Sequence, residues 1–240
     1  MSGIVTTWAI FKKEMRIYFV SPLAYVFLGV FLFLAGLFFY MGVSMTGEAS
    51  LRVMLSNLSV TLLFMLPLLT MKHFAEERRS GTFELMMTAP VPLWSLLAGK
   101  WAASVALCVL LLVGTGIFPL VLAYYGDPDW GVVMTSYLGL LLTCGAFVSA
   151  GLFSSSLTDE PVAAGLGGVL VLLPFWIAGN AADMVTIDWL RTVMRHLAFL
   201  THVEPFTRGE VDSAHVAWFA IFTFGFLFLT WRSIESRRWR

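Results

Sequence analysis

The residues best suited to binding or chemistry gather in one charged stretch, Glu76 to Pro92, which reads EERRSGTFELMMTAPVP. Long apolar runs flank it, from Val53 to Met71 and from Trp101 to Gly126. Two segments that each cross a bilayer and are joined by about 20 residues must enter and leave on the same side. The whole stretch therefore lies on one membrane face, where a protein outside the bilayer can press on the membrane part.

Inside this stretch the local pattern predicts a short helix that carries an apolar knob. Gly81 permits a turn into the helix, Thr82 can cap it, and Glu84 suits its first turn. Phe83, with a methionine one turn on, offers an anchor for a hydrophobic groove. The alternative is a solvated loop whose charges only set the topology. The predicted contact residues are Glu76, Glu77, Arg78, Arg79, Gly81, Thr82, Phe83, Glu84, Met86 and Met87.

The sequence lacks the phosphate-cradling motif G-x-x-x-x-G-K-[ST]. Its one Gly-Lys pair, Gly99–Lys100, has Trp94 where the first glycine is needed and Trp101 where a serine or threonine is needed. We therefore expect no cofactor in this chain, and any ATP with its Mg²⁺ must be bound by another chain.

Enzymatic and metal chemistry are equally poorly represented. There is no H-E-x-x-H and no G-x-S-x-G, and the four histidines fall at membrane borders or in a loop, where a structural role is expected. Cys108 and Cys144 sit in apolar runs and are predicted to be buried hydrophobic residues. Since no ionisable residue is central to a predicted span, proton or ion relay is not expected, and an intramembrane enzyme is the least favoured interpretation.

The elements that position these residues are membrane helices. Of the 240 residues, 59% are hydrophobic and 12% charged, whereas a soluble domain has about 25% charged residues. A formal net charge of zero argues against nucleic-acid binding. We predict an all-α integral membrane protein, with kinks at Pro67, Pro119 and Pro174. Its six spans are predicted at 22–43, 53–73, 94–124, 132–156, 161–181 and 213–231.

Charge asymmetry predicts the orientation. An even number of spans puts both termini on one side, and cytoplasmic segments carry an excess of Lys and Arg. With the termini in the cytoplasm, only Arg52, Arg191, Arg195 and Arg208 of the 15 basic residues lie outside. The chain is thus expected to be a multi-pass membrane protein with both termini cytoplasmic.

Residues 4–20 predict an amphipathic helix that lies in the membrane interface. Ile4, Trp8, Phe11, Met15 and Tyr18 recur at steps of three and four and share one stripe. The cations are expected to face anionic headgroups, although the segment can also be read as a simple flank of the first span. The interfacial residues are predicted to be Trp8, Phe11, Lys12, Lys13 and Arg16.

Residues 183–212 are too long for a plain connection between spans. Leu190, Val193, Met194 and Leu197 form an apolar stripe within them. We expect a short helix resting on or dipping into the outer leaflet, and a surface cap without a direct role is the alternative.

Several stretches resemble the ABC-2 class of ABC-transporter permeases, and most closely its gliding-motility-associated subfamily. They are FKKEMRIYFVSPLAYVFLGVFLFLAGLFFY from Phe11, FAEERRSGTFELMMTAPVPLWSLLAGKW from Phe74, GLFSSSLTDEPVAA from Gly151 and EPFTRGEVDSAHVAWFAIFTFGFLFLTWRSIESRRW from Glu204. The second is the most specific, because it is similar to the family's coupling segment.

The resemblance implies a single membrane domain over 1–240, with an elbow helix at 4–20, a coupling helix at 76–90 and an extracytoplasmic helical segment at 183–212. It also implies a separate ABC ATPase subunit, a second permease copy (identical or a sister chain) and an extracytoplasmic partner protein. The expected function is a permease that couples ATP hydrolysis to export or to work outside the membrane. The alternatives are a mechanotransmitter that moves no cargo and a permease for maturing a copper enzyme.

Overall fold

The computed structural model describes residues 3–46, 50–83, 91–126 and 128–238, and within them every regular element is a helix. Six helical stretches are long and apolar enough to cross a membrane, which confirms the predicted number of spans. They are Pro22–Ser44, Arg52–Arg79, Leu93–Tyr125, Trp130–Leu157, Pro161–Ala182 and Ser213–Ser236.

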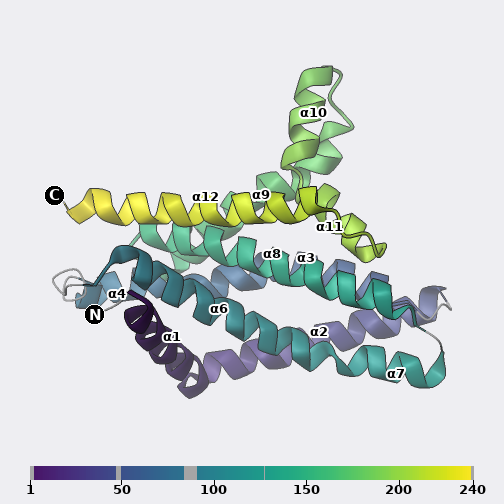
Figure 1. Cartoon of the computed structure of the whole chain (residues 1–240), viewed down its shortest axis with the longest axis horizontal. Coiled ribbons are helices and arrows are strands. Elements are labelled where there is room, and N and C mark those ends of the chain that lie inside the picture. The colour runs from purple at the N-terminus through teal and green to yellow at the C-terminus, as the bar shows by residue number, and fades with distance from the viewer. Residues whose placement is uncertain (1–2, 47–49, 84–90, 127, 239–240) are drawn as a thin grey trace.

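The spans lie side by side, and both chain ends lie at the same end of the bundle, here called the termini end (Figure 1). Helix α1 (Gly3–Val20) crosses this end obliquely before the first span, α2 (Pro22–Thr46). The opposite end, here called the distal end, carries α7 (Ile117–Tyr125) and α11 (Phe199–Thr207). The last span, α12 (Ser213–Arg238), returns from the distal end to the termini end.

Helix α8 (Trp130–Leu157) forms the centre of the bundle, because it packs against α3 (Arg52–Thr70), α9 (Pro161–Ala182) and α12. Small residues on α8 allow this close approach. A Cβ added at Gly151 would lie 2.1 Å from Thr70 Oγ1, and one at Gly139 would lie 2.7 Å from Phe206 Cβ. Both glycines are therefore required by the helices that pack on them.

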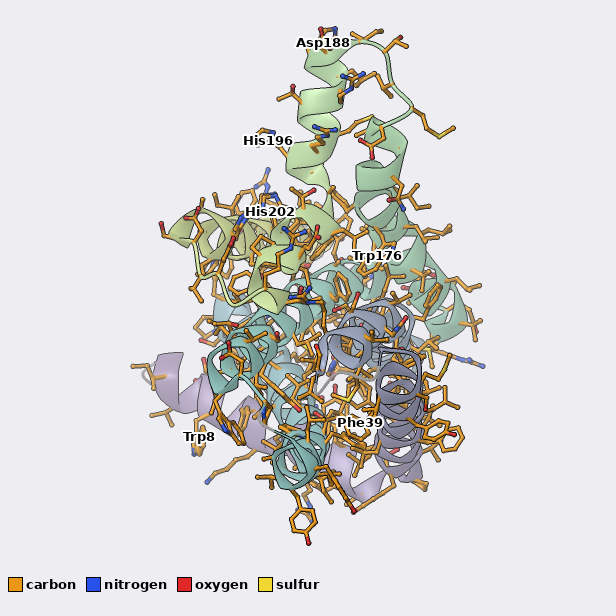
Figure 2. The ribbon with its side chains drawn as sticks, turned by 90° about the vertical axis from the view of Figure 1, so that its right-hand side faces the viewer. Trp8, Phe39, Trp176, Asp188, His196 and His202 are labelled. Carbon is orange, nitrogen blue, oxygen red and sulfur yellow. The ribbon has the colours of Figure 1, made fainter. Side chains whose placement is uncertain are left out.

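Proline and glycine mark irregular points in the spans. Span three divides at Gly116 into α6 (Leu93–Thr115) and α7, just before Pro119, which has no N–H to continue the ladder. Pro67 and Pro174 lie inside α3 and α9. The far part of α9 leaves the bundle together with α10 (Asp188–Leu197), and the two form an arm that projects across the span direction (Figures 1 and 2).

The segment predicted at 183–212 thus contains two helices, α10 and α11. Within α10, Trp189, Val193 and Leu197 are exposed. The helix that contains span two is longer than the predicted span. Helix α4 (Lys72–Arg79) continues α3 almost without interruption, so Glu76 to Arg79 lie on an extension of span two. A turn at Ser80 and Gly81 separates them from helical residues at Thr82 and Phe83, and residues 84–90 of the predicted coupling helix lie outside the described residues.

Candidate functional site

The junction between α3 and α4 is held by one serine of α8. The Ser155 hydroxyl donates to the Met71 carbonyl (2.9 Å) and accepts from the N–H groups of Phe74 (3.1 Å) and Ala75 (3.2 Å). Ser155 thereby bonds to backbone groups that would otherwise hydrogen-bond only to other backbone groups of the helix. Helix α4 is therefore fixed to the centre of the bundle at the point where it leaves span two.

On its other side α4 meets a buried ionic group, here called the Lys100 cluster: Glu14 of α1, His73 and Glu77 of α4, and Lys100 of α6. Lys100 is 1% exposed, and its ammonium donates to Glu14 Oε1 (2.9 Å), Glu77 Oε1 (2.8 Å) and the His73 carbonyl (3.1 Å). An ammonium has three protons, and all three are used here.

Glu14, which is 5% exposed, contacts a second partner in the cluster. Its Oε2 lies 3.5 Å from His73 Nδ1, while His73 Nε2 lies 2.7 Å from Tyr18 Oη and 2.8 Å from Ser104 Oγ. Burial opposes the charge on Glu14, but the hydrogen bond with His73 and the Lys100 ammonium outweigh it and hold the pKa of Glu14 well below its usual range. The carboxylate is therefore ionised at neutral pH.

The end of α4 carries the charged residues singled out from the sequence. Arg78 lies 3.5 Å from Asp159, and Arg79 lies 3.7 Å from Glu160, both in the turn between α8 and α9. Glu76 is exposed and pairs with Lys72 at 3.8 Å. The contacts of Arg78 and Arg79 join α4 to the turn between α8 and α9, and Arg79 remains exposed at the tip of α4.

The turn after α4 has the conformation that the sequence predicts for glycine. Gly81 has a φ of +71°, in the left-handed region, and the Thr82 hydroxyl donates back to the Glu77 carbonyl. Phe83 is 9% exposed and packs edge-on against Phe74, with Arg78 over its ring. In this conformation Phe83 is thus directed inward and is not a free knob. The predicted contact residues Glu84, Met86 and Met87 lie outside the described residues.

The predicted interfacial residues lie on α1 away from its buried face. Trp8 is exposed, stacks on Phe11 and carries Lys12 over its ring. Lys12, Lys13 and Arg16 are exposed, and Figure 2 shows Trp8 at the outer side of the molecule. The stripe that faces the protein is Ile10, Glu14 and Tyr18. The prediction that Tyr18 shares the interfacial stripe of Trp8 is therefore wrong.

Sequence reasoning missed the Lys100 cluster because it assigned no partner to Lys100 and no buried role to Glu14. Two signals were available. Glu14 falls four residues from both Ile10 and Tyr18, on one helical face. Lys100 stands in an apolar stretch that α6 includes from Leu93 onward. A charge on a buried stripe predicts a buried partner, although it does not say which residue that is.

At the distal end the histidines that sequence analysis assigned to structure do meet. His202 Nδ1 lies 2.8 Å from His215 Nδ1, and His202 Nε2 lies 3.0 Å from the His196 carbonyl. That carbonyl also accepts from Trp218 Nε1 (2.8 Å), and the Trp218 ring stacks on His202. Burial, with His215 and His196 nearby, lowers the pKa of His202. This group, here called the His202 cluster, joins α10, α11 and α12.

Among the residues that the structure describes, no three His, Cys, Asp or Glu side chains converge as metal ligands. Cys108 and Cys144 are buried free thiols. The polar groups that do converge join helices to one another. Fold and site together define a polytopic helical membrane protein. Its buried Lys100 cluster lies beside α4, the helix that extends span two to the surface.

Comparison with known families agrees with this description. The model of the ABC-2 family transporter protein matches residues 44–230, which is more than half of the chain, and the chain belongs to this family. A search of curated proteins found no match to it. The chain is therefore the permease, or membrane component, of an ABC-2 transporter, a non-catalytic subunit that works with an ATPase.

Proposed function

We propose that the tip of α4 and the turn after it are where the ATPase subunit docks, with the termini end in the cytoplasm. The excess of Lys and Arg on the segments at this end supports that orientation. The main support for this docking site is the position of α4. It extends from span two to the surface and is fixed to the bundle on two sides, through Ser155 and through Lys100.

A force applied at this tip would act directly on a span. Helix α4 continues α3, which packs against α8 and α9, so displacing α4 displaces the helices at the centre of the bundle. ATP and Mg²⁺ are bound by the partner, and two permease copies, identical or sister chains, complete the transporter. The subfamily that fits the sequence best is the gliding-motility-associated one, in a bacterial inner membrane, with a copper-enzyme-maturation permease as the alternative.

Two kinds of output fit this input. The first is export of a cargo between the two permease copies. The second is mechanical work on an extracytoplasmic partner without transport, and the projecting α9–α10 arm favours it. The arm leaves the bundle (Figure 1) and exposes Met184, Trp189 and Val193, which offer apolar surface for a partner or for the outer leaflet.

The docking site is tested by reversing one charge at the tip. Arg79 and Arg232 have side chains that are 67% and 64% exposed, each 3.7 Å from a glutamate, but Arg232 lies on α12. We expect R79E to lower recovery of the ATPase with the tagged permease, because it reverses a charge at the interface, while R232E leaves recovery unchanged. Equal recovery with R79E and wild type, or an equal loss with both variants, would count against docking at α4.

A further inference from the structure

The Lys100 cluster connects three elements that the sequence keeps far apart. Glu14 is 86 residues from Lys100, and Glu77 is 23 residues from it. Helices α1 and α6 also pack directly on each other, with Ile10 against Gly99 and the Ser95 hydroxyl donating to the Gly3 carbonyl. Helix α4 packs its backbone mainly against α8 and α9. Its connection to the α1–α6 pair therefore depends on the side chains of the Lys100 cluster and their neighbours.

Stability alone does not account for such a cluster. Burying an ion pair removes both charges from water, and well-packed apolar residues in its place are often as stable or more so. An ionic contact does, however, fix the geometry of its partners, because each donor must face its acceptor. Lys100 faces one carboxylate from α1 and one from α4.

The two carboxylates are held unequally. Glu14 has a partner at each oxygen, Lys100 and His73. Glu77 Oε1 accepts from Lys100, whereas Glu77 Oε2 is buried without a hydrogen-bond partner among the described residues. A cavity of about 380 Å³ lies beside the cluster, lined in part by Glu77, Tyr18 and Lys72. Glu77 is thus the less fully paired of the two carboxylates, and it borders space in which it can move.

From this geometry we infer that Glu14, Glu77 and Lys100 are positioning residues that form an ionic joint between α4 and the α1–α6 pair. When the ATPase displaces α4, the joint makes the elbow helix and span three move with it. The inference rests on the proposed function for the input at α4, but the joint itself is a property of the permease. Without the joint, α4 would move while α1 remained in place.

The test compares wild type with a variant in which the cluster is neutral, E14Q/E77Q/K100M. Removing all three charges together avoids leaving one buried charge unpaired, so the variant is expected to fold. K13M is the matched control, because Lys13 also pairs with Glu77 (3.5 Å) but its side chain is 52% exposed. Spin labels at K12C, E76C and R232C report on α1, α4 and α12. Cys108 and Cys144 are both buried, which directs labelling to the new cysteines.

In the purified complex with its ATPase, we expect ATP to shift the 76–232 and 12–232 distances together in wild type and in K13M. In the neutral variant the 76–232 shift should persist while the 12–232 shift is lost. A neutral variant that retains the 12–232 shift overturns the joint.

A second measurement on the permease alone separates the two proposals. If ATP does not shift the 76–232 distance in wild type, the proposal that the ATPase acts on α4 is wrong. The joint is then judged from the distance between labels at positions 12 and 76, measured without the ATPase. We expect this distribution to be narrow in wild type and K13M and broad in the neutral variant. Equal widths in all three proteins overturn the joint whatever the input.

Discussion

The two ends of the bundle are held by different chemistry. The termini end uses the Lys100 cluster, in which full charges are buried between α1, α4 and α6. The distal end uses the His202 cluster, which joins α10, α11 and α12: the imidazoles of His202 and His215 contact each other, and the carbonyl of His196 is shared by His202 and the Trp218 indole. A buried ion pair requires both partners, whereas neutral imidazoles can exchange donor and acceptor roles. Under the proposed docking at α4, the first arrangement suits the end on which the ATPase acts, whereas the second makes the stability of the other end depend on pH.

The largest expected effect comes from removing the charge on Lys100. K100M leaves the carboxylates of Glu14 and Glu77 buried without their shared cation. Breaking a buried ion pair from one side costs about 3–5 kcal/mol, so we expect a large fall in melting temperature in detergent.

Lys72 provides the matched comparison for this variant. K72M removes a cation whose side chain is 48% exposed and whose pairing with Glu76 spans one helical turn. It should cost less than about 1 kcal/mol. If K72M and K100M lowered the melting temperature equally, the contrast between buried and exposed charge at this end would be wrong.

A smaller effect is expected where a glycine allows a helix to approach. A Cβ at Gly99 would lie 2.8 Å from Ile10 Cγ2 and 3.0 Å from the Thr7 carbonyl oxygen, and one at Gly139 would lie 2.7 Å from Phe206 Cβ. Overpacking of this kind costs about 1–3 kcal/mol. We expect G99A to make α1 more sensitive to limited proteolysis and G139A to do the same for α11.

Gly29 is the control for both glycine variants, since an added Cβ there meets no atom within 4 Å. G29A should leave the proteolysis pattern unchanged. Cleavage at both ends in both glycine variants would show that the two ends open as one unit. That result would contradict the independent packing of α1 and α11.

The smallest expected effect is a change of stability with pH, which should differ between the two ends because different groups titrate there. The pKa of His202 is lowered in the folded protein, so the unfolded chain binds more protons once the pH falls below the ordinary histidine value of about 6.5. Stability from neutral His202 is therefore present above that pH and lost below it. The pKa of Glu14 is far below its usual range, so the Lys100 cluster keeps that charge throughout.

Melting temperatures measured from pH 7.5 to 5.5 check this contrast. We expect wild type to lose stability on acidification and H202Q to lose less, since the glutamine does not titrate. A parallel fall in wild type and H202Q would assign the pH dependence to other groups and remove His202 as its source.

The sequence predicted the helices more completely than it predicted the site. The number of spans and the glycine turn at Gly81 follow from local composition and agree with the structure. The helix that contains span two continues as α4 to Arg79, beyond the predicted span at 53–73, because its neighbours in space allow the charged segment from Lys72 to remain helical. Phe83 read as a free knob, but Phe74 and Arg78 bury it.

What the sequence determined by itself was a membrane protein of six spans without a nucleotide motif, since span length and motif spacing are properties of consecutive residues. What only the tertiary structure decided was which charges are paired. Glu14 and Lys100 lie 86 residues apart in the chain and 2.9 Å apart in space. No local pattern encodes that contact, because it depends on how α1 packs on α6 and on where α4 emerges from span two.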